Sequence, residues 1–353
     1  MTFDEARAQF PALGTLAYLN AGTNGPLAQA TIDAMVLQAR SDLAGGRSGK
    51  VYFERMLELR TQARARFAEL LGVDPAHVAL TESTSRGCAI VLAGLALGED
   101  DEVVTTDQEH FGLLGPLHAT GARVVVTEAT EDAILAAITP RTRLIATSHV
   151  LWTTGRRLDL HLLERETGLP VLVDGAQSAG AIDVEIGELD YYTVSAQKWL
   201  CAPDPSGGLY VRDPESLRIR SPSFFAQASY EPSGAFVPKE DASRFDAGWA
   251  GVSNLAGLVA ALGVHPPWRY ERAAEMAARC ASRLADLVEV VTPPGHSTLV
   301  SFRSAGDPAA LVERLRERGV IVRELPGRNL VRASCGWWTN EDDVERLAAG
   351  LAE

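Results

Sequence analysis

Short apolar segments alternate with amphipathic segments between about residues 75 and 215. The apolar segments are rich in Val, Ile and Tyr and end at turn residues: VVTT (103–106), VVVTEA (124–129), LIATSHV (144–150), VLVDGA (171–176), YYTVSA (191–196) and GGLYVR (207–212). Such segments are typical of strands that are buried on both faces. Helix-like segments at 131–138 and 160–168 lie between them, so the pattern predicts a mostly parallel sheet with helices on both faces.

The pattern changes after about residue 215. Residues 219–254 are rich in Ser, Pro, Gly and aromatic residues and contain few periodic segments, which indicates an extended connection. A long helix is predicted at about 269–288, because apolar residues recur there at helical spacing. A smaller α+β pattern follows, with strands expected at 298–304, 320–324 and 329–334 and helices at 308–319 and 340–352.

The length of 353 residues favours two domains over one small core. We place an N-terminal segment at 1–14, a large domain at 15–255 and a small C-terminal α+β domain at 256–353. The net charge of −13 argues against nucleic acid and anionic membranes as partners. No apolar run is long enough to span a bilayer, and MTFDEARAQF does not resemble a signal peptide, so we expect a cytoplasmic protein.

The four cysteines are Cys88, Cys201, Cys280 and Cys335. They form no CxxC pair and no cysteine–histidine cluster with zinc spacing, so we expect no metal site. Thiols stay reduced in the cytosol, and we interpret each cysteine as a small buried apolar residue.

Lysine is rare in this chain, which carries its positive charge almost entirely as arginine. The only lysines are Lys50, Lys198 and Lys239. Lys198 follows the predicted strand YYTVSA, and Asp174 ends VLVDGA. In an open α/β sheet, ligands bind beyond the carboxyl ends of the strands. Arginine cannot supply a neutral amine, so a lysine kept at this position indicates a chemical role.

Other polar residues belong to the same sheet edge. His110 follows the strand at 103–106, and Thr84 and Ser85 open a predicted helix whose free amides form an anion site. Each feature alone has an ordinary explanation, such as a surface lysine, a packed histidine or an N-cap. Together they match the needs of pyridoxal phosphate (PLP). An amine forms a Schiff base with its aldehyde, a carboxylate holds its ring nitrogen protonated, and hydroxyls and amides bind its phosphate.

Six motifs resemble those of fold-type I PLP enzymes of the class V aminotransferase group, which includes the cysteine desulfurases. They are YLNAGTNGPL, TESTSRG, DQEHFG, VDGAQSAG, SAQKWL and RASCGWWTNEDDVERL. The resemblance covers nearly the whole chain. It implies a large domain with a mostly parallel seven-stranded sheet, a small C-terminal α+β domain, and a homodimer with the active site near the subunit interface.

The resemblance also implies the roles of the site residues. Lys198 carries the Schiff base and His110 stacks on the pyridine ring, and both are catalytic. Arg332 binds the substrate α-carboxylate, and Asn20 lies in the segment on the substrate side. The remaining cofactor contacts are Thr84, Ser85, Ser195 and Gln197 at the phosphate, Asp174 at the pyridine nitrogen and Gln177 near the phenolic oxygen.

Three departures from the desulfurase pattern bear on the reaction. Desulfurases carry a nucleophilic cysteine on a mobile loop before the arginine motif, whereas RGVIVRELPGRNLVRAS has none, and Cys335 follows the motif directly. In HVLWTTG, Trp152 or Thr153 replaces an asparagine, and this pattern is more similar to the cystine lyase and isopenicillin-epimerase-like branch. Trp249 lies near the position of a threonine that reaches the phosphate of the neighbouring subunit.

These features favour a carbon–sulfur lyase that acts by β-elimination on cystine or a cysteine derivative. An aminotransferase or an amino-acid epimerase is the alternative, because both share removal of the α-proton and the fold does not fix the reaction. A desulfurase with an unusual cysteine, or a PLP-fold protein without activity, fits the sequence less well. The tryptophans at 152, 249, 337 and 338 could line a pocket or pack in a core.

Overall fold

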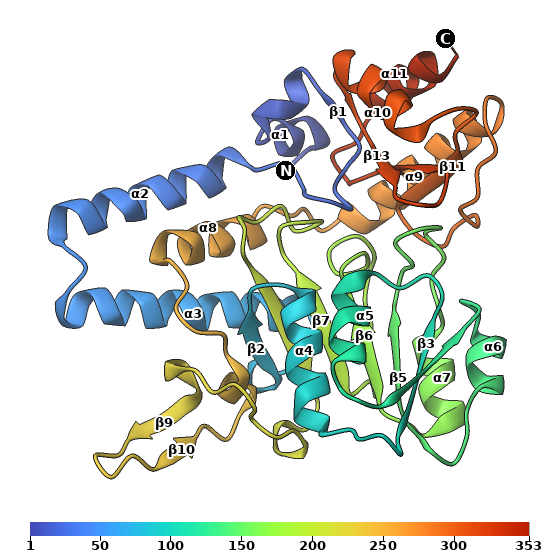
Figure 1. Ribbon diagram of the computed structural model, residues 1–353. Coiled ribbons are helices and arrows are strands. Elements are labelled where there is room, and N and C mark those ends of the chain that lie inside the picture. The colour runs from blue at the N-terminus through green and yellow to red at the C-terminus, as the bar shows by residue number, and fades with distance from the viewer. Residues whose placement is uncertain (353) are drawn as a thin grey trace.

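A seven-stranded sheet is the central element of the computed structural model, which describes residues 1–352 (Figure 1). The strand order is β2-β8-β7-β6-β5-β3-β4. The bounds are β2 (Val78–Thr81), β3 (Glu102–Thr106), β4 (Arg123–Thr127), β5 (Thr142–Ser148), β6 (Val171–Asp174), β7 (Tyr191–Ser195) and β8 (Gly207–Val211). β8 runs antiparallel to both of its neighbours, β2 and β7, and all other neighbouring strands in this sheet are parallel. The predicted mostly parallel sheet is confirmed.

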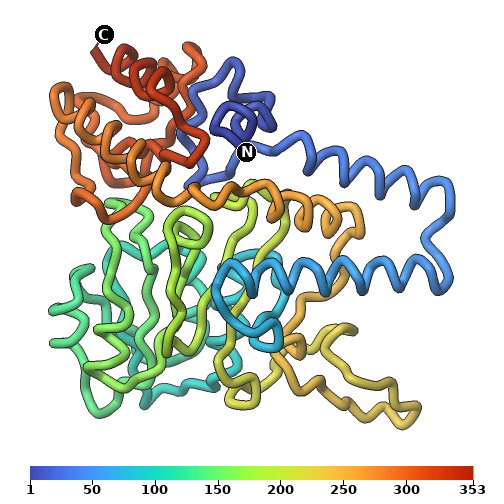
Figure 2. Tube along the Cα trace, turned by 180° about the vertical axis from the view of Figure 1, so that it is seen from behind, coloured from blue at the N-terminus to red at the C-terminus, as the bar shows by residue number. Residues whose placement is uncertain are grey.

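Helices cover both faces of this sheet (Figures 1 and 2). The α-helices of residues 1–352, including those of the C-terminal part, are α1 (Phe3–Arg7), α2 (Gln29–Gly45), α3 (Gly49–Leu71), α4 (Thr84–Leu95), α5 (Phe111–His118), α6 (Glu131–Ala136), α7 (Leu160–Thr167), α8 (Val252–Leu262), α9 (Arg269–Ala285), α10 (Pro308–Glu317) and α11 (Glu341–Leu351). Figures 1 and 2 both show α2 and the start of α3 projecting away from the sheet. No helix within residues 1–352 is long and apolar enough to cross a membrane.

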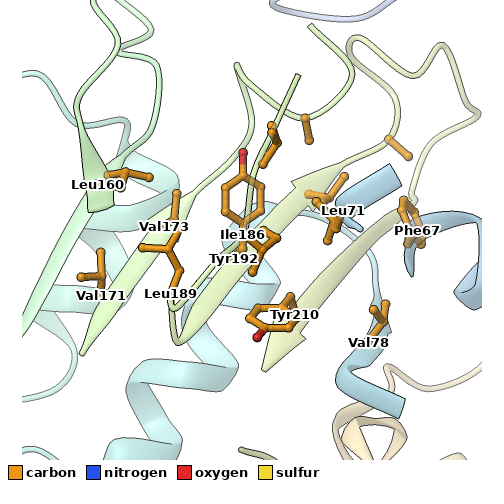
Figure 3. Packing of buried hydrophobic residues seen from close by; sticks show 14 of the residues in the cluster. Phe67, Leu71, Val78, Leu160, Val171, Val173, Ile186, Leu189, Tyr192 and Tyr210 are labelled. Carbon is orange, nitrogen blue, oxygen red and sulfur yellow. The ribbon is translucent and has the colours of Figure 1, made fainter. Parts of the chain in front are cut away.

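Each central strand contributes to two hydrophobic cores, because successive side chains point to opposite faces of the sheet. Val103 and Leu144 pack with α4 and α5 on one face. The next residues, Val104 and Ile145, pack with α3, α6 and α7 on the other face. Figure 3 shows part of this second core, including Tyr192 of β7. The continuous apolar segments in the sequence therefore reflect burial on both faces.

The C-terminal part forms its own antiparallel sheet in the order β11-β14-β13. Its strands are β11 (Leu299–Arg303), β13 (Arg323–Leu325) and β14 (Leu330–Ser334), and β11 and β14 share a core with α9, α10 and α11. Near the N-terminus, β1 (Ala17–Tyr18) pairs in parallel with β12 (Val320–Ile321) and joins this core. The domain boundaries at residues 14 and 255 stay a prediction.

Two segments differ from the expected elements. Residues 219–254 contain a hairpin of β9 (Gln227–Tyr230) and β10 (Phe236–Pro238) and the beginning of α8, rather than only an extended connection. The single strand expected at 320–324 is divided into β12 and β13. The division arises because β12 pairs with β1, whereas β13 pairs with β14.

Candidate active site

A cavity of about 150 Å³ opens at the carboxyl ends of the parallel strands. Its walls contain all eight residues that the sequence analysis placed at the cofactor: Thr84, Ser85, His110, Asp174, Gln177, Ser195, Gln197 and Lys198. The sheet brings them together because they lie at or just after the carboxyl ends of four strands, β2, β3, β6 and β7. Asn20 and Arg332, expected on the substrate side, do not line this cavity. Arg332 contacts Trp152 of the cavity wall, and Asn20 pairs with Ser334 of β14.

The N-terminus of α4 forms one wall of the cavity. The Thr84 N–H donates to Ser195 Oγ at 3.2 Å, and the two hydroxyl oxygens are 3.1 Å apart. Ser83 is the N-cap and accepts from the Arg86 N–H. Amides in the first helical turn lack partners within the helix and carry partial positive charge, so this wall suits a phosphate group.

Asp174 ends β6 and is buried. Its Oδ1 accepts a hydrogen bond from the Ala176 N–H at 2.9 Å, while its second oxygen has no hydrogen-bond partner within residues 1–352. A buried carboxylate is costly unless a cation or donor meets it. The free oxygen can therefore hold a protonated ring nitrogen in the cavity.

Lys198 lies in the turn that follows β7, at the wall of the same cavity. Burial lowers the pKa of its amine to about 8, and the charges of Arg332 and Arg323 contribute in the same direction. Asp174 opposes this shift. A lysine with this pKa has a useful neutral fraction near physiological pH, as a nucleophile or a base requires.

His110 is the N-cap of α5, and its Nδ1 accepts a hydrogen bond from the Gly112 N–H at 3.0 Å. The ring proton of the neutral form is therefore on Nε2. Burial, followed by the charge of Lys198, lowers the pKa of His110. The Trp152 ring meets it edge-on, with 5.3 Å between the centroids. His110 thus presents a neutral aromatic ring to the cavity, which suits stacking on a flat heterocycle.

The two glutamines differ in their hydrogen bonding. Gln177 donates from Nε2 to the Gly22 carbonyl at 2.8 Å and accepts from Trp199 Nε1 at 3.1 Å, which fixes the orientation of its amide. One N–H of Gln177 stays available toward the cavity. Gln197 Oε1 is buried and has no partner within the described residues.

Glu109 is a buried residue of this region to which the sequence analysis gave no role. Its carboxylate accepts hydrogen bonds from the hydroxyls of Thr106, Thr147 and Ser148 and from the Ser148 N–H, at 2.5–2.9 Å. Burial raises the pKa of Glu109, while these donors act in the opposite direction. Glu109 therefore ties the end of β3 to the end of β5, beside His110. Its position after an apolar strand was the only signal in the sequence.

Arg332 of β14 is fully buried, and its Nη1 donates to the Trp152 carbonyl at 2.8 Å. Burial lowers its pKa to about 9, with a further contribution from the charge of Arg323. A Cβ at Gly22 would lie 2.6 Å from Arg332 Nη2, so only glycine leaves room for the guanidinium. Arg332 Nε, Trp152 Nε1 and Ser334 Oγ are buried without partners in the described part of the chain. These atoms can serve acceptor and donor groups of a ligand.

Arg323 was missed by the sequence analysis. It lies directly opposite Arg332 in the β13–β14 pair, and its Nη1 donates to Thr23 Oγ1 at 3.1 Å. Its charge also lowers the pKa values of Lys198 and His110, which places it on the same side of the site. The sequence alone does not mark Arg323 as a site residue, because its pairing with Arg332 depends on the register of β13 and β14.

The remaining candidates have less direct positions. Asn20 pairs with Ser334 through an isolated bridge, and its Oδ1 accepts from Thr23 Oγ1 at 2.8 Å. It therefore lies beside β14, and its substrate role stays a prediction. Trp337 and Trp338 pack with Phe10 in a buried cluster and do not line the site.

The sheet, the lysine and carboxylate at its edge and the phosphate-binding helix N-terminus define a fold-type I PLP enzyme. The chain belongs to the aminotransferase class-V family, because residues 17–347 match the sequence profile of that family. The residues of the cavity fit PLP, because the free Asp174 oxygen would hold its ring nitrogen, the α4 N-terminus would hold its phosphate and the Lys198 amine would bind its aldehyde.

Three known proteins resemble this chain over nearly its full length. Isopenicillin N epimerase of Amycolatopsis lactamdurans is 31% identical over 400 aligned positions, covering 99% of this chain and 97% of the relative. The cysteine desulfurase CsdA of Escherichia coli is 28% identical, covering 97% and 94%. The solved structure of the cystine C–S lyase C-DES with its product cysteine persulfide has a TM-score of 0.92 and 29% identity, covering 98% and 99%. Another C-DES structure carries glycine covalently linked to PLP.

Proposed function

We propose that the protein is a PLP-dependent carbon–sulfur lyase that eliminates the sulfur group of cystine or a related cysteine derivative. The observation that carries the proposal is the pair of arginines, Arg332 and Arg323, opposite each other beside the cavity. Cystine has a carboxylate at each end, and a guanidinium binds a carboxylate strongly through two parallel hydrogen bonds. Arg332 would bind the carboxylate at the reacting carbon, and Arg323 would bind the distal one.

The residues of the cavity can carry out the proton transfers that elimination needs. PLP supplies a ring that accepts the electron pair left at the substrate α-carbon. Lys198, with a pKa of about 8, would remove the α-proton as a neutral amine and hold it as an ammonium group. Asp174 would hold the ring nitrogen, and His110 would exclude water from one face of the ring. The sulfur group leaves without a protein nucleophile.

The cysteines support a lyase over a desulfurase. All four are buried, and none lines the cavity within the described residues. Cys335 contacts Cys280, and this contact together with burial raises its pKa well above the usual thiol value. The thiolate is the nucleophilic form of cysteine, so Cys335 is a poor sulfur acceptor. The likeness to the cystine lyase C-DES supports the same conclusion.

Epimerisation is the second candidate, because a curated relative at 31% identity is an isopenicillin N epimerase. That reaction removes and returns the α-proton without loss of a side-chain group. The two functions therefore share Lys198 and Arg332 and differ in whether a leaving group is expelled.

We further propose a homodimer that forms through the projecting helices. Large apolar side chains are exposed there, including Leu37 at 72%, Leu43 at 86% and Val51 at 80%. Trp249, 59% exposed, extends this surface and stacks on Phe224. Apolar patches of this kind mark interfaces between proteins. The predicted cytoplasmic location is retained as part of the same proposal.

Product analysis with L-cystine tests the proposed reaction. The purified holoenzyme would be mixed with cystine under single-turnover conditions, and pyruvate, ammonia and persulfide would be measured together. A lyase gives the three products in equal amounts. A keto acid that retains the sulfur, with conversion of the cofactor to its amine form, would establish an aminotransferase. Loss of optical purity without pyruvate would establish an epimerase.

A further inference from the structure

A second cavity lies apart from the active site, between α9 and residues 290–300 on one side and the turns that carry Arg157 and Asp183 on the other. Its volume is about 610 Å³, and it shares no wall residue with the active-site cavity. Small-molecule sites commonly have volumes of about 300–1,000 Å³ and occur where two structural units meet. Figures 1 and 2 place α9 on the side of the molecule away from the projecting end of the α2–α3 pair.

The floor of this cavity is apolar. Ala274, Ala278, Ala281 and Ala285 form one stripe along α9, because they recur at intervals of three and four residues. Their small side chains leave a hollow that an apolar group can fill. The wall also contains an unpaired polar atom. The Oγ1 of Thr298, a residue only 1% exposed, has no hydrogen-bond partner within residues 1–352.

The mouth of the cavity carries opposite charges that are not paired. The side chains of Arg157 and Asp183 both line it, and neither makes an ion pair or hydrogen bond in the part of the chain that the structure describes. His296 Nδ1 accepts from the Arg157 backbone N–H at 3.1 Å, so the neutral ring carries its proton on Nε2 as a further donor. One unpaired cation and one unpaired anion over an apolar floor complement a zwitterion with an apolar side chain.

We propose that this cavity is a binding site for a free amino acid with a large apolar or aromatic side chain. The ligand carboxylate pairs with Arg157 and the Nε2–H of His296, and its ammonium group pairs with Asp183. Its side chain lies on the alanine stripe of α9. Such a ligand satisfies both charges at once, which neither a fatty acid nor an amine can do.

The site is connected to the substrate arginine from both walls. On one wall, Arg157 closes the turn that begins at Val150, and Trp152 within that turn accepts the hydrogen bond of Arg332. On the other wall, Leu299 of β11 pairs with Ser334, two residues after Arg332 on β14. A bound amino acid therefore contacts Arg157 and Leu299, which lead to the two neighbours of Arg332, Trp152 and Ser334. We expect occupancy to change the KM for the substrate more than kcat, an effect that rests on the proposed role of Arg332.

Calorimetric titration of the holoenzyme with L-phenylalanine tests the binding. Ala278→Phe fills the hollow from an exposed position on α9, and Arg157→Met removes the cation. Ala349→Phe makes the same change at an exposed position on α11 and serves as the control. We expect saturable binding without a change in the cofactor absorbance in wild type and in Ala349→Phe. Affinity should fall about tenfold or more in the other two variants.

Three results would overturn the proposal: no saturable heat, equal affinity in Ala278→Phe and wild type, or binding that always shifts the cofactor absorbance. The last result would mean that L-phenylalanine enters only the active site. A second readout is the KM for cystine with and without L-phenylalanine, which should change at least about twofold in wild type and stay constant in Ala278→Phe. The calorimetric result stands whether or not cystine proves to be the substrate, so the two proposals fail independently.

Discussion

The two ends of the active site differ in how far the protein satisfies its own polar groups. At the cofactor end, Thr84 and Ser195 are joined to each other at 3.1–3.2 Å. At the substrate end, Trp152 Nε1, Arg332 Nε and Ser334 Oγ are buried without partners in residues 1–352. Each buried unsatisfied group costs about 1–3 kcal/mol, so a ligand that pairs with these atoms recovers that free energy. The comparison indicates a phosphate wall fixed by the fold, whereas Gln197 Oε1 at the cofactor end and the three atoms at the substrate end are left for a ligand.

The largest expected effect is at the cofactor end. Lys198→Ala should remove the visible absorbance band of the bound cofactor and lower turnover about a thousandfold or more, because the amine both binds the aldehyde and transfers the proton. Absorbance spectra and single-turnover assays measure both changes. Lys50→Ala, at an exposed lysine paired with Glu54, is the matched control and should leave both unchanged. A retained band in Lys198→Ala would contradict the assignment.

At the substrate end, Arg332→Met should lower kcat/KM about a hundredfold, because a charge-assisted carboxylate contact contributes roughly 1.5–3 kcal/mol. Arg332→Lys should lose less, since it keeps the charge and loses the two-pronged geometry. Steady-state kinetics with cystine check this order. The cofactor band and Tm of each variant show whether the buried substitution has disturbed the fold. Equal activity in wild type and Arg332→Met would contradict a role of Arg332 in substrate binding.

The pKa of Lys198 predicts how apoenzyme loads with PLP. Only the neutral amine attacks the aldehyde, and the pKa of about 8 means that the neutral fraction increases as pH rises toward that value. The loading rate should therefore rise about tenfold per pH unit below pH 8 and level off above it. Stopped-flow absorbance at several pH values measures this profile. A rate that continues to rise past pH 10 would show an ordinary exposed lysine.

The smallest expected effect is at Cys335. Cys335→Ala should leave kcat within about twofold per folded enzyme, because this buried thiol lies in the core with Cys280 and not in the cavity. The substitution should lower stability by only about 1 kcal/mol, a cost typical of point mutations. Persulfide assays and thermal unfolding measure the two effects. Loss of sulfur release with the fold intact would restore a desulfurase mechanism.

The sequence could place the predicted cofactor residues at one edge of the sheet because their signals are local. Asp174 and Lys198 each follow an apolar strand, and the parallel topology then places them at one edge. The fold class and the cofactor are confirmed, whereas the individual residue roles stay predictions. The lyase reaction is also a proposal, within a family that is established.

The substrate end could not be predicted in the same way, because it depends on register and long-range pairing. Arg323 faces Arg332 only because β13 pairs with β14 in this register. The split between β12 and β13 depends on β1, about 300 residues earlier in the chain. Glu109 is recognisable only once its donors, Thr147 and Ser148, are seen beside it. No periodic pattern carries that information.

The central claim is that two arginines recognise a substrate with two carboxylates. The most direct measurement compares kcat/KM for cystine and for β-chloroalanine, which has no distal carboxylate, in wild type and Arg323→Met. We expect the value for cystine to fall at least about tenfold and the value for β-chloroalanine to stay within about twofold. An equal fall for both substrates, or no fall for either, would contradict the claim.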